Sequence, residues 1–109
     1  MIVEFVYEEN EQKRTVGKFE IADLKYLMLE VIPNIIANKT YYPENSSTNV
    51  DSADIVVVFD WDNRVVYLEI LSQQDDDVIV YGGTMDAFNE VSSELLREIE
   101  QDLYRCNEN

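Results

Sequence analysis

The sequence predicts an α+β domain with the element order ββαβββα. Residues 55–71, IVVVFDWDNRVVYLEIL, place two runs of β-branched and aromatic residues on either side of Asp62-Asn63, a pair that tolerates the positive φ of a two-residue hairpin turn. Two other segments, near residues 22–38 and 84–106, carry apolar residues at the period of a helix. Because short turns join most of the strands, we expect a mainly antiparallel five-stranded sheet with both helices on one face.

The first two strands are predicted from residues 2–7 and 15–19. Val3, Phe5 and Tyr7 alternate with their neighbours and therefore share one face of the first strand. The polar run at residues 8–14 is expected to be the turn between the strands.

The first helix is predicted over residues 22–38. Asp23 lies in its first turn, where a carboxylate complements the helix dipole, and Asn38 is the expected C-terminal cap. Pro33 cannot donate to the carbonyl of Leu29, so we expect a kink or a break there. A long polar loop follows at residues 38–53. The apolar stripe of the helix consists of Leu24, Leu27, Met28, Val31, Ile32, Ile35 and Ile36.

The central hairpin has two unlike faces. Pairing Trp61 with Arg64, as a cation–π pair, sets a register that places Phe59 opposite Val66, Val57 opposite Leu68 and Ile55 opposite Ile70. That face is apolar and is expected to be covered by the helices. The other face alternates Val56, Val58, Val65, Tyr67 and Leu71 with Asp54, Asp60 and Glu69. It is expected to be open.

The chain ends with a strand and a helix. Residues 77–81 form the predicted strand, which Gly82-Gly83 is expected to end. Thr84 is the expected cap of the final helix, with Asp86 in the first turn, and residues 107–109 are expected to fray. The buried stripe of this helix is predicted to be Phe88, Val91, Leu95, Ile99 and Leu103.

Composition limits the classes of function. The 109 residues suit a single domain, and 23 acidic against 8 basic side chains give a net charge of −15. Such a chain repels phosphate and anionic lipid and attracts basic surfaces, so we expect no direct contact with nucleic acid or membrane. One cysteine cannot form an internal disulfide, which suits a cytoplasmic protein.

No motif for catalysis is present in the sequence. The chain has no histidine, which removes Ser-His and Cys-His nucleophiles, and it has no glycine-rich phosphate loop. Residues 60–63 begin like a calcium loop but lack its glycine and its distal glutamate. Asp and Asn are also typical turn residues. We therefore expect no enzyme activity, no metal and no cofactor.

The final helix carries a row of like charges. Glu90, Glu94, Glu98 and Asp102 follow one another at intervals of four residues, and each neighbouring pair costs ~0.2–0.5 kcal/mol in an isolated helix. Arg97 and Arg105 offset only part of this cost. The row advances about 6 Å per step, comparable with the spacing of backbone phosphates. The alternative interpretation is a solvated acidic face without a partner.

These observations favour a non-catalytic acidic protein that inhibits a basic, nucleic-acid-processing partner. Two forms fit: an immunity protein against a nuclease-type toxin, and a phage anti-defence protein that mimics nucleic acid. The expected partner-binding residues are Glu90, Glu94 and Glu98, with Asp60, Asp62, Asp75, Asp76 and Asp77 as secondary candidates. The alternative is a structural or regulatory module that forms a homodimer through an open-face patch of Val56, Val58, Val65 and Tyr67.

Overall fold

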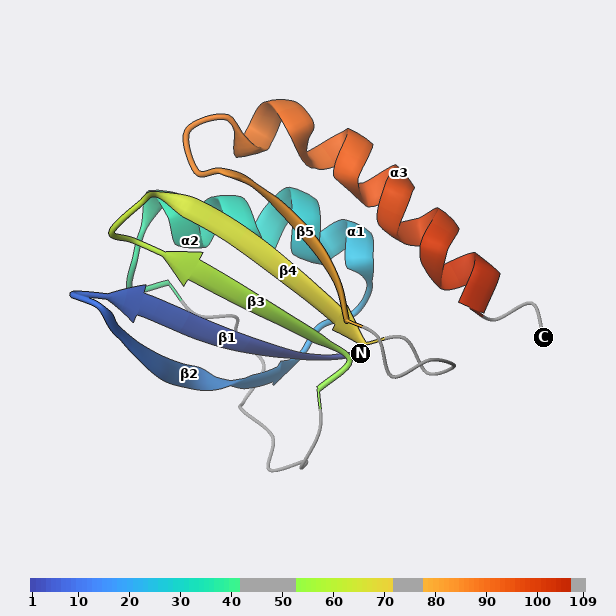
Figure 1. The fold of residues 1–109 in the computed structure, drawn as a ribbon. Helices are drawn as coiled ribbons and strands as arrows, with labels where there is room; N and C mark the ends of the chain where they lie inside the picture. The colour runs from blue at the N-terminus through green and yellow to red at the C-terminus, as the bar shows by residue number, and fades with distance from the viewer. Residues whose placement is uncertain (42–52, 72–77, 107–109) are drawn as a thin grey trace.

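The structure, a computed structural model, describes residues 1–41, 53–71 and 78–106, and it confirms the predicted order ββαβββα (Figure 1). Most of the predicted loop at 38–53, the carboxylates at 75–77 and the chain end at 107–109 lie outside these residues. The strands are β1 (Ile2–Glu9), β2 (Gln12–Glu20), β3 (Ile55–Asp60), β4 (Val65–Leu71) and β5 (Val78–Thr84). The helical segments are α1 (Leu24–Tyr26), η1 (Leu27–Val31), α2 (Ile32–Ala37) and α3 (Phe88–Cys106).

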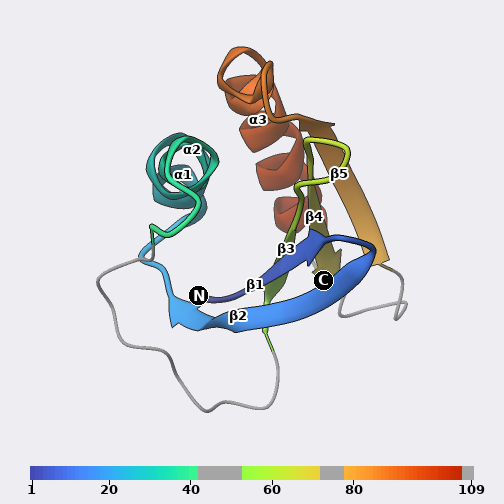
Figure 2. The same cartoon turned by 90° about the vertical axis from the view of Figure 1, so that its left-hand side faces the viewer.

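The five strands form one mixed sheet in the order β2-β1-β3-β4-β5. Only β1 and β3 are parallel among these neighbours, because the connection from β2 to β3 runs through the first helix and returns beside β1. Both helical layers lie on the same side of the sheet, as predicted, and α3 runs back alongside β5 (Figures 1 and 2). The other side of β3, β4 and β5 faces the viewer in Figure 1.

The core lies between the sheet and the helices. Every second residue of the central strands points into it, so Phe5, Phe59 and Leu68 are fully buried, while η1 supplies Leu27 and Met28 from above. The register predicted for the central hairpin is confirmed at all three pairs. Other buried members are Val3, Tyr7, Phe19, Ile21, Leu24, Val31, Ile32, Ile35, Ile55, Val57, Val66, Ile70, Met85, Phe88 and Ile99.

The first hairpin is longer than predicted. Its strands extend to a two-residue turn at Asn10 and Glu11, whose φ values are 55° and 61°. The polar run at 8–14 is therefore mostly strand, because β2 is an edge strand and its exposed side chains can be polar. A register shift beside Phe5 and Val6 adds a bulge to this hairpin.

The turn of the central hairpin also differs from the prediction. Four residues, Trp61–Arg64, connect β3 to β4, and the positive φ of 54° falls on Arg64 rather than on Asp62-Asn63. The predicted Trp61–Arg64 cation–π pair is wrong. Arg64 instead pairs with Asp86 at 3.1 Å, and the Nζ atom of Lys39 lies 5.3 Å from the centre of the Trp61 ring.

The first helix does not break at Pro33, where a kink or a break is predicted, but continues past the proline through a π turn. The N–H of Ile32 donates to the carbonyl of Leu27, so the turn widens directly before the residue that has no N–H. Asp23 is the N-cap rather than a first-turn residue, and its Oδ1 atom accepts from the backbone N–H of Tyr26 at 2.7 Å. Asn38 is the C-cap, as predicted.

The final strand ends later than predicted, and the final helix begins later. β5 continues through Gly82 and Gly83, which therefore do not end it. A Cβ atom on Gly82 would lie 3.1 Å from Cδ1 of Tyr67 on the paired strand, so this glycine makes room for the Tyr67 ring. Because α3 begins at Phe88, Asp86 precedes the helix, although Thr84 Oγ1 still accepts from the N–H of Ala87 at 3.3 Å.

Candidate functional site

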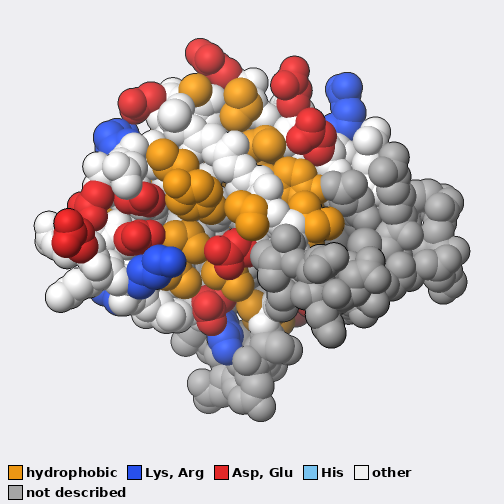
Figure 3. Space-filling model, in the orientation of Figure 1, with side chains coloured by type: hydrophobic (Ala, Val, Ile, Leu, Met, Phe, Trp, Pro, Cys, Tyr) orange, Lys and Arg blue, Asp and Glu red, His pale blue; other side chains and the backbone are white. Residues whose placement is uncertain are grey.

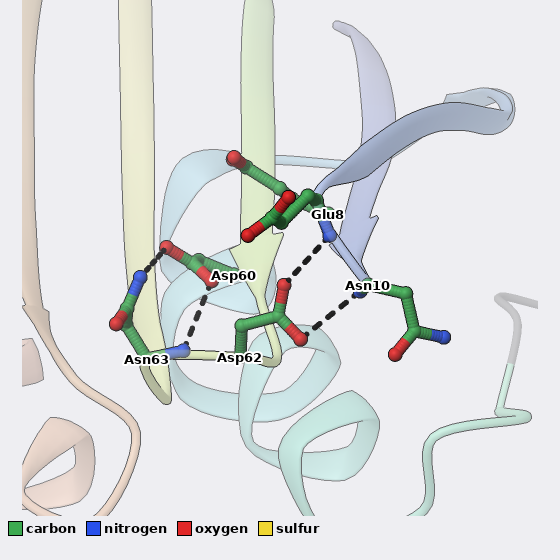
Figure 4. Close-up of a pocket in the computed structure, with 6 residues that line it drawn as sticks. Glu8, Asn10, Asp60, Asp62 and Asn63 are labelled. Atoms are coloured by element: carbon green, nitrogen blue, oxygen red, sulfur yellow. Dashed lines mark hydrogen bonds between the residues drawn. The ribbon is translucent and has the colours of Figure 1, made fainter.

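Two of the predicted acidic residues hold turns together at one end of the sheet (Figure 4). Asp60 is only 5% exposed, and its carboxylate accepts from the backbone N–H and the side-chain amide of Asn63 at 3.0 and 2.9 Å. Asp62 accepts from the N–H groups of Glu11 and Asn10 at 3.1 and 3.0 Å, which links the two hairpin turns. These two hydrogen bonds, that of Glu11 first, lower the pKa of Asp62 below its usual value of 3.8.

The same end of the sheet forms an open hollow of about 550 Å³. Its lining is carboxylate and amide: Glu8, Asn10, Glu11, Asp60, Asp62 and Asn63. Within the described ranges, no group of three or more Asp, Glu or Cys side chains is placed to hold a metal ion. The contacts of Asp60 and Asp62 agree with their interpretation as turn residues.

The glutamate row of α3 has a different environment. Glu90, Glu94 and Glu98 are all exposed, and none of them forms an ion pair with a residue that the structure describes. The ion pairs among the described residues lie elsewhere, and they join Lys18 to Glu4, Lys39 to Glu9, and Arg64 to Asp86. The row therefore presents negative charge to solvent without an ion pair among the described residues.

A groove runs between β5 and α3. It has a volume of about 350 Å³ and combines the backbone of β5 with apolar and acidic residues of the helix. Glu94 and Glu98 belong to its lining, whereas Glu90 does not. Sequence reasoning missed this groove, because it depends on α3 returning beside the edge of the sheet. The lining residues are Gly82, Gly83, Thr84, Ala87, Val91, Glu94, Leu95 and Glu98.

The open face of the sheet carries the predicted apolar patch, and Figure 3 shows apolar side chains gathered at its centre with carboxylates around them. Val58 is 6% exposed, whereas Val80 of the edge strand is 57% exposed. By strand alternation Val6 and Val80 belong to the same face, and sequence reasoning did not include them. The period of two along β1 is the signal that could have found Val6. The patch thus comprises Val6, Val56, Val58, Val65, Tyr67 and Val80.

Comparison with known proteins gives no family assignment, since no protein-family model, curated protein or solved structure matches the chain. None of the helices in the described ranges is long and apolar enough to cross a membrane. The described residues present two distinct surfaces: the acidic helix with its groove, and the apolar patch of the open face.

Proposed function

We propose that this protein is a non-catalytic binding protein that inhibits a basic, nucleic-acid-processing protein by covering its basic surface. One observation carries the proposal: Glu90, Glu94 and Glu98 form an exposed row without ion-pair partners among the described residues. Like charges one turn apart disfavour the helix. A basic partner would compensate them.

The charge distribution along the chain supports the same partner. Residues 88–106 contain five carboxylates and two arginines, while three of the eight basic residues lie together on β2. A surface of one sign attracts an oppositely charged partner over several ångströms and raises the association rate. The α3 side of the molecule is therefore the side that a basic protein would approach.

Two biological forms remain consistent with this chemistry. An immunity protein would cover the nucleic-acid-binding surface of a toxin, and an anti-defence protein would occupy the same kind of surface on a host defence protein. Both uses need carboxylates at a spacing like that of phosphates, and the step of about 6 Å along the α3 row provides it.

The test is the binding of charge variants to a partner recovered by pull-down at low salt. Replacing Glu90, Glu94 and Glu98 with Gln should weaken binding and reduce its salt dependence, because fewer charges steer association. The matched control replaces Glu20, Glu30 and Glu100, three exposed carboxylates that lie off the row and outside the hollow at the turn end, with Gln. Equal affinity and equal salt slope for both triple variants would contradict the proposal.

The second candidate function is a module that forms a homodimer through the open face. The observation in its favour is the apolar patch of the open face, which the strand registers define and whose apolar surface Figure 3 shows. Against it stands the net charge of −15, which makes two copies repel each other. A mass that rises with protein concentration, and falls again after Tyr67→Lys, would favour this function over the first.

A further inference from the structure

The two edges of the sheet are protected to different degrees. β2 carries Lys13, Arg14 and Lys18, and it pairs with β1 through a bulge. Charged side chains and bulges are both common devices that prevent another strand from pairing with a sheet edge. β5, with the sequence VIVYGGT, has no charged residue and no proline, and its seven pairs with β4 follow one register without a shift. In the described part of the chain, no strand pairs with its outer edge.

The hydrogen bonds of β5 show which backbone groups reach that outer edge. The N–H of Met85 donates to the carbonyl of Arg64 at 2.8 Å, in line with the register that pairs Val65 with Thr84. In an antiparallel pair, inward and outward hydrogen bonding alternates from residue to residue. Val80 and Gly82 are therefore the central residues whose N–H and C=O groups face away from β4.

The groove of α3 lies beside this free edge. Val91 and Leu95 are only partly buried there, and Glu94 and Glu98 line the same groove. The two glutamates are about 6 Å apart along the helix axis, and alternate residues of a strand are about 6.7 Å apart. A strand laid along β5 would thus offer its side chains to α3 at nearly the spacing of the carboxylates.

We infer that β5 and α3 together bind an extended segment of the partner, which adds to the sheet as a sixth strand and carries Lys or Arg at alternate positions. The inference rests on the proposed function and specifies how the basic partner is held. The aliphatic stems of the basic side chains would cover Val91 and Leu95, and their charged ends would reach Glu94 and Glu98.

A second copy of this chain fits the same edge poorly. If two β5 strands paired, each copy would bring its own glutamate row to the shared groove, and like charges would face one another. Charge complementarity therefore selects a basic segment over self-association.

The test uses a seven-residue peptide of alternating Lys and Val, which matches the length of β5, and measures binding to the full chain at low salt. Val80→Pro removes an outward N–H without removing a bond to β4, while Val80→Ala changes the side chain and keeps that N–H. We expect V80A to bind like the wild type and V80P to bind at least about tenfold more weakly, as the loss of a backbone hydrogen bond implies.

A second pair of variants tests the carboxylates. E94Q/E98Q should weaken peptide binding more than E90Q/E100Q, although both remove two charges from α3. A peptide with N-methyl groups on one edge tests strand addition without any change to the protein, so a poorly folded V80P variant would not stop the experiment. The methylated peptide should bind the wild-type protein as weakly as the unmethylated peptide binds V80P.

The outcomes separate this inference from the proposed function. Equal binding by V80P and V80A, or by the methylated and unmethylated peptides, overturns strand addition even if the glutamates matter. A dimer that V80P abolishes overturns it in favour of a second copy. Added protection from amide exchange at Val80 and Gly82, with none on β2, supports it. The proposed function fails only if the recovered partner binds the Glu90, Glu94 and Glu98 triple variant as tightly as it binds the wild type.

Discussion

The carboxylates at the turn end of the sheet and those on the outer face of α3 differ in what they contact. Asp60 and Asp62 each accept two hydrogen bonds from turn residues, and Asp60 is almost completely buried. Glu90, Glu94 and Glu98 have no such partner among the described residues. The comparison teaches that acidic residues of one chain can serve the fold in one region and remain available for binding in another.

The largest effect on stability should come from a truncation in the hydrophobic core, on which both regions are built. Leu68 is fully buried on β4, and Leu68→Ala should lower the free energy of unfolding by ~2–5 kcal/mol through lost burial and a cavity. Denaturant unfolding measures this value. Wild-type stability would mean that the covered face of the sheet has been assigned to the wrong side.

Asp60→Ala should have the next largest effect, because it leaves the N–H of Asn63 without its acceptor inside a partly buried turn. We expect a loss of ~1–3 kcal/mol in the free energy of unfolding. Asp60→Asn, which keeps one acceptor oxygen, should lose less. If Asp60→Ala is neutral, Asp60 belongs with the available carboxylates, and the distinction between the two regions fails.

The contribution of the Asp62 carboxylate to the free energy of unfolding should be smaller, and it should depend on pH. Its folded pKa is lowered by the hydrogen bonds from Glu11 and Asn10, so its stabilising contribution is complete above the unfolded pKa near 3.8 and is lost as pH falls through the lower folded value. An NMR titration should place its pKa below 3.8, with the amide signals of Asn10 and Glu11 moving in parallel. A pKa above 3.8 would show that the two turns are not linked in solution.

The sequence was sufficient to predict the arrangement of the strands and helices. The order of elements, the register of the central hairpin and the common side of both helices all follow from apolar periodicity. These signals are local or repeat along one element. They can therefore be interpreted without knowing which segments pack against each other in the folded protein.

The remaining features depend on contacts between distant segments. Glu11 adopts a positive φ where Asp62, far along the chain, accepts its N–H, and Gly82 continues β5 where the ring of Tyr67 occupies the space of its missing side chain. Likewise, Lys39 rather than Arg64 lies over Trp61. The glutamate row was visible as a pattern, but the groove beside it required the position of α3.

The most direct test of the central claim, that the α3 row is carried at a cost to stability, is the free energy of unfolding of E94Q/E98Q at low salt. By sequence spacing, the variant removes three like-charge pairs, Glu90–Glu94, Glu94–Glu98 and Glu98–Asp102, and one opposite pair, Glu94–Arg97. The free energy of unfolding should therefore increase by ~0.4–1 kcal/mol, and the gain should shrink as added salt screens the charges. E30Q/E100Q, which removes two exposed carboxylates that have no acidic residue three or four positions away, should gain less. A loss of stability in E94Q/E98Q would contradict the claim, because the carboxylates would then serve the fold.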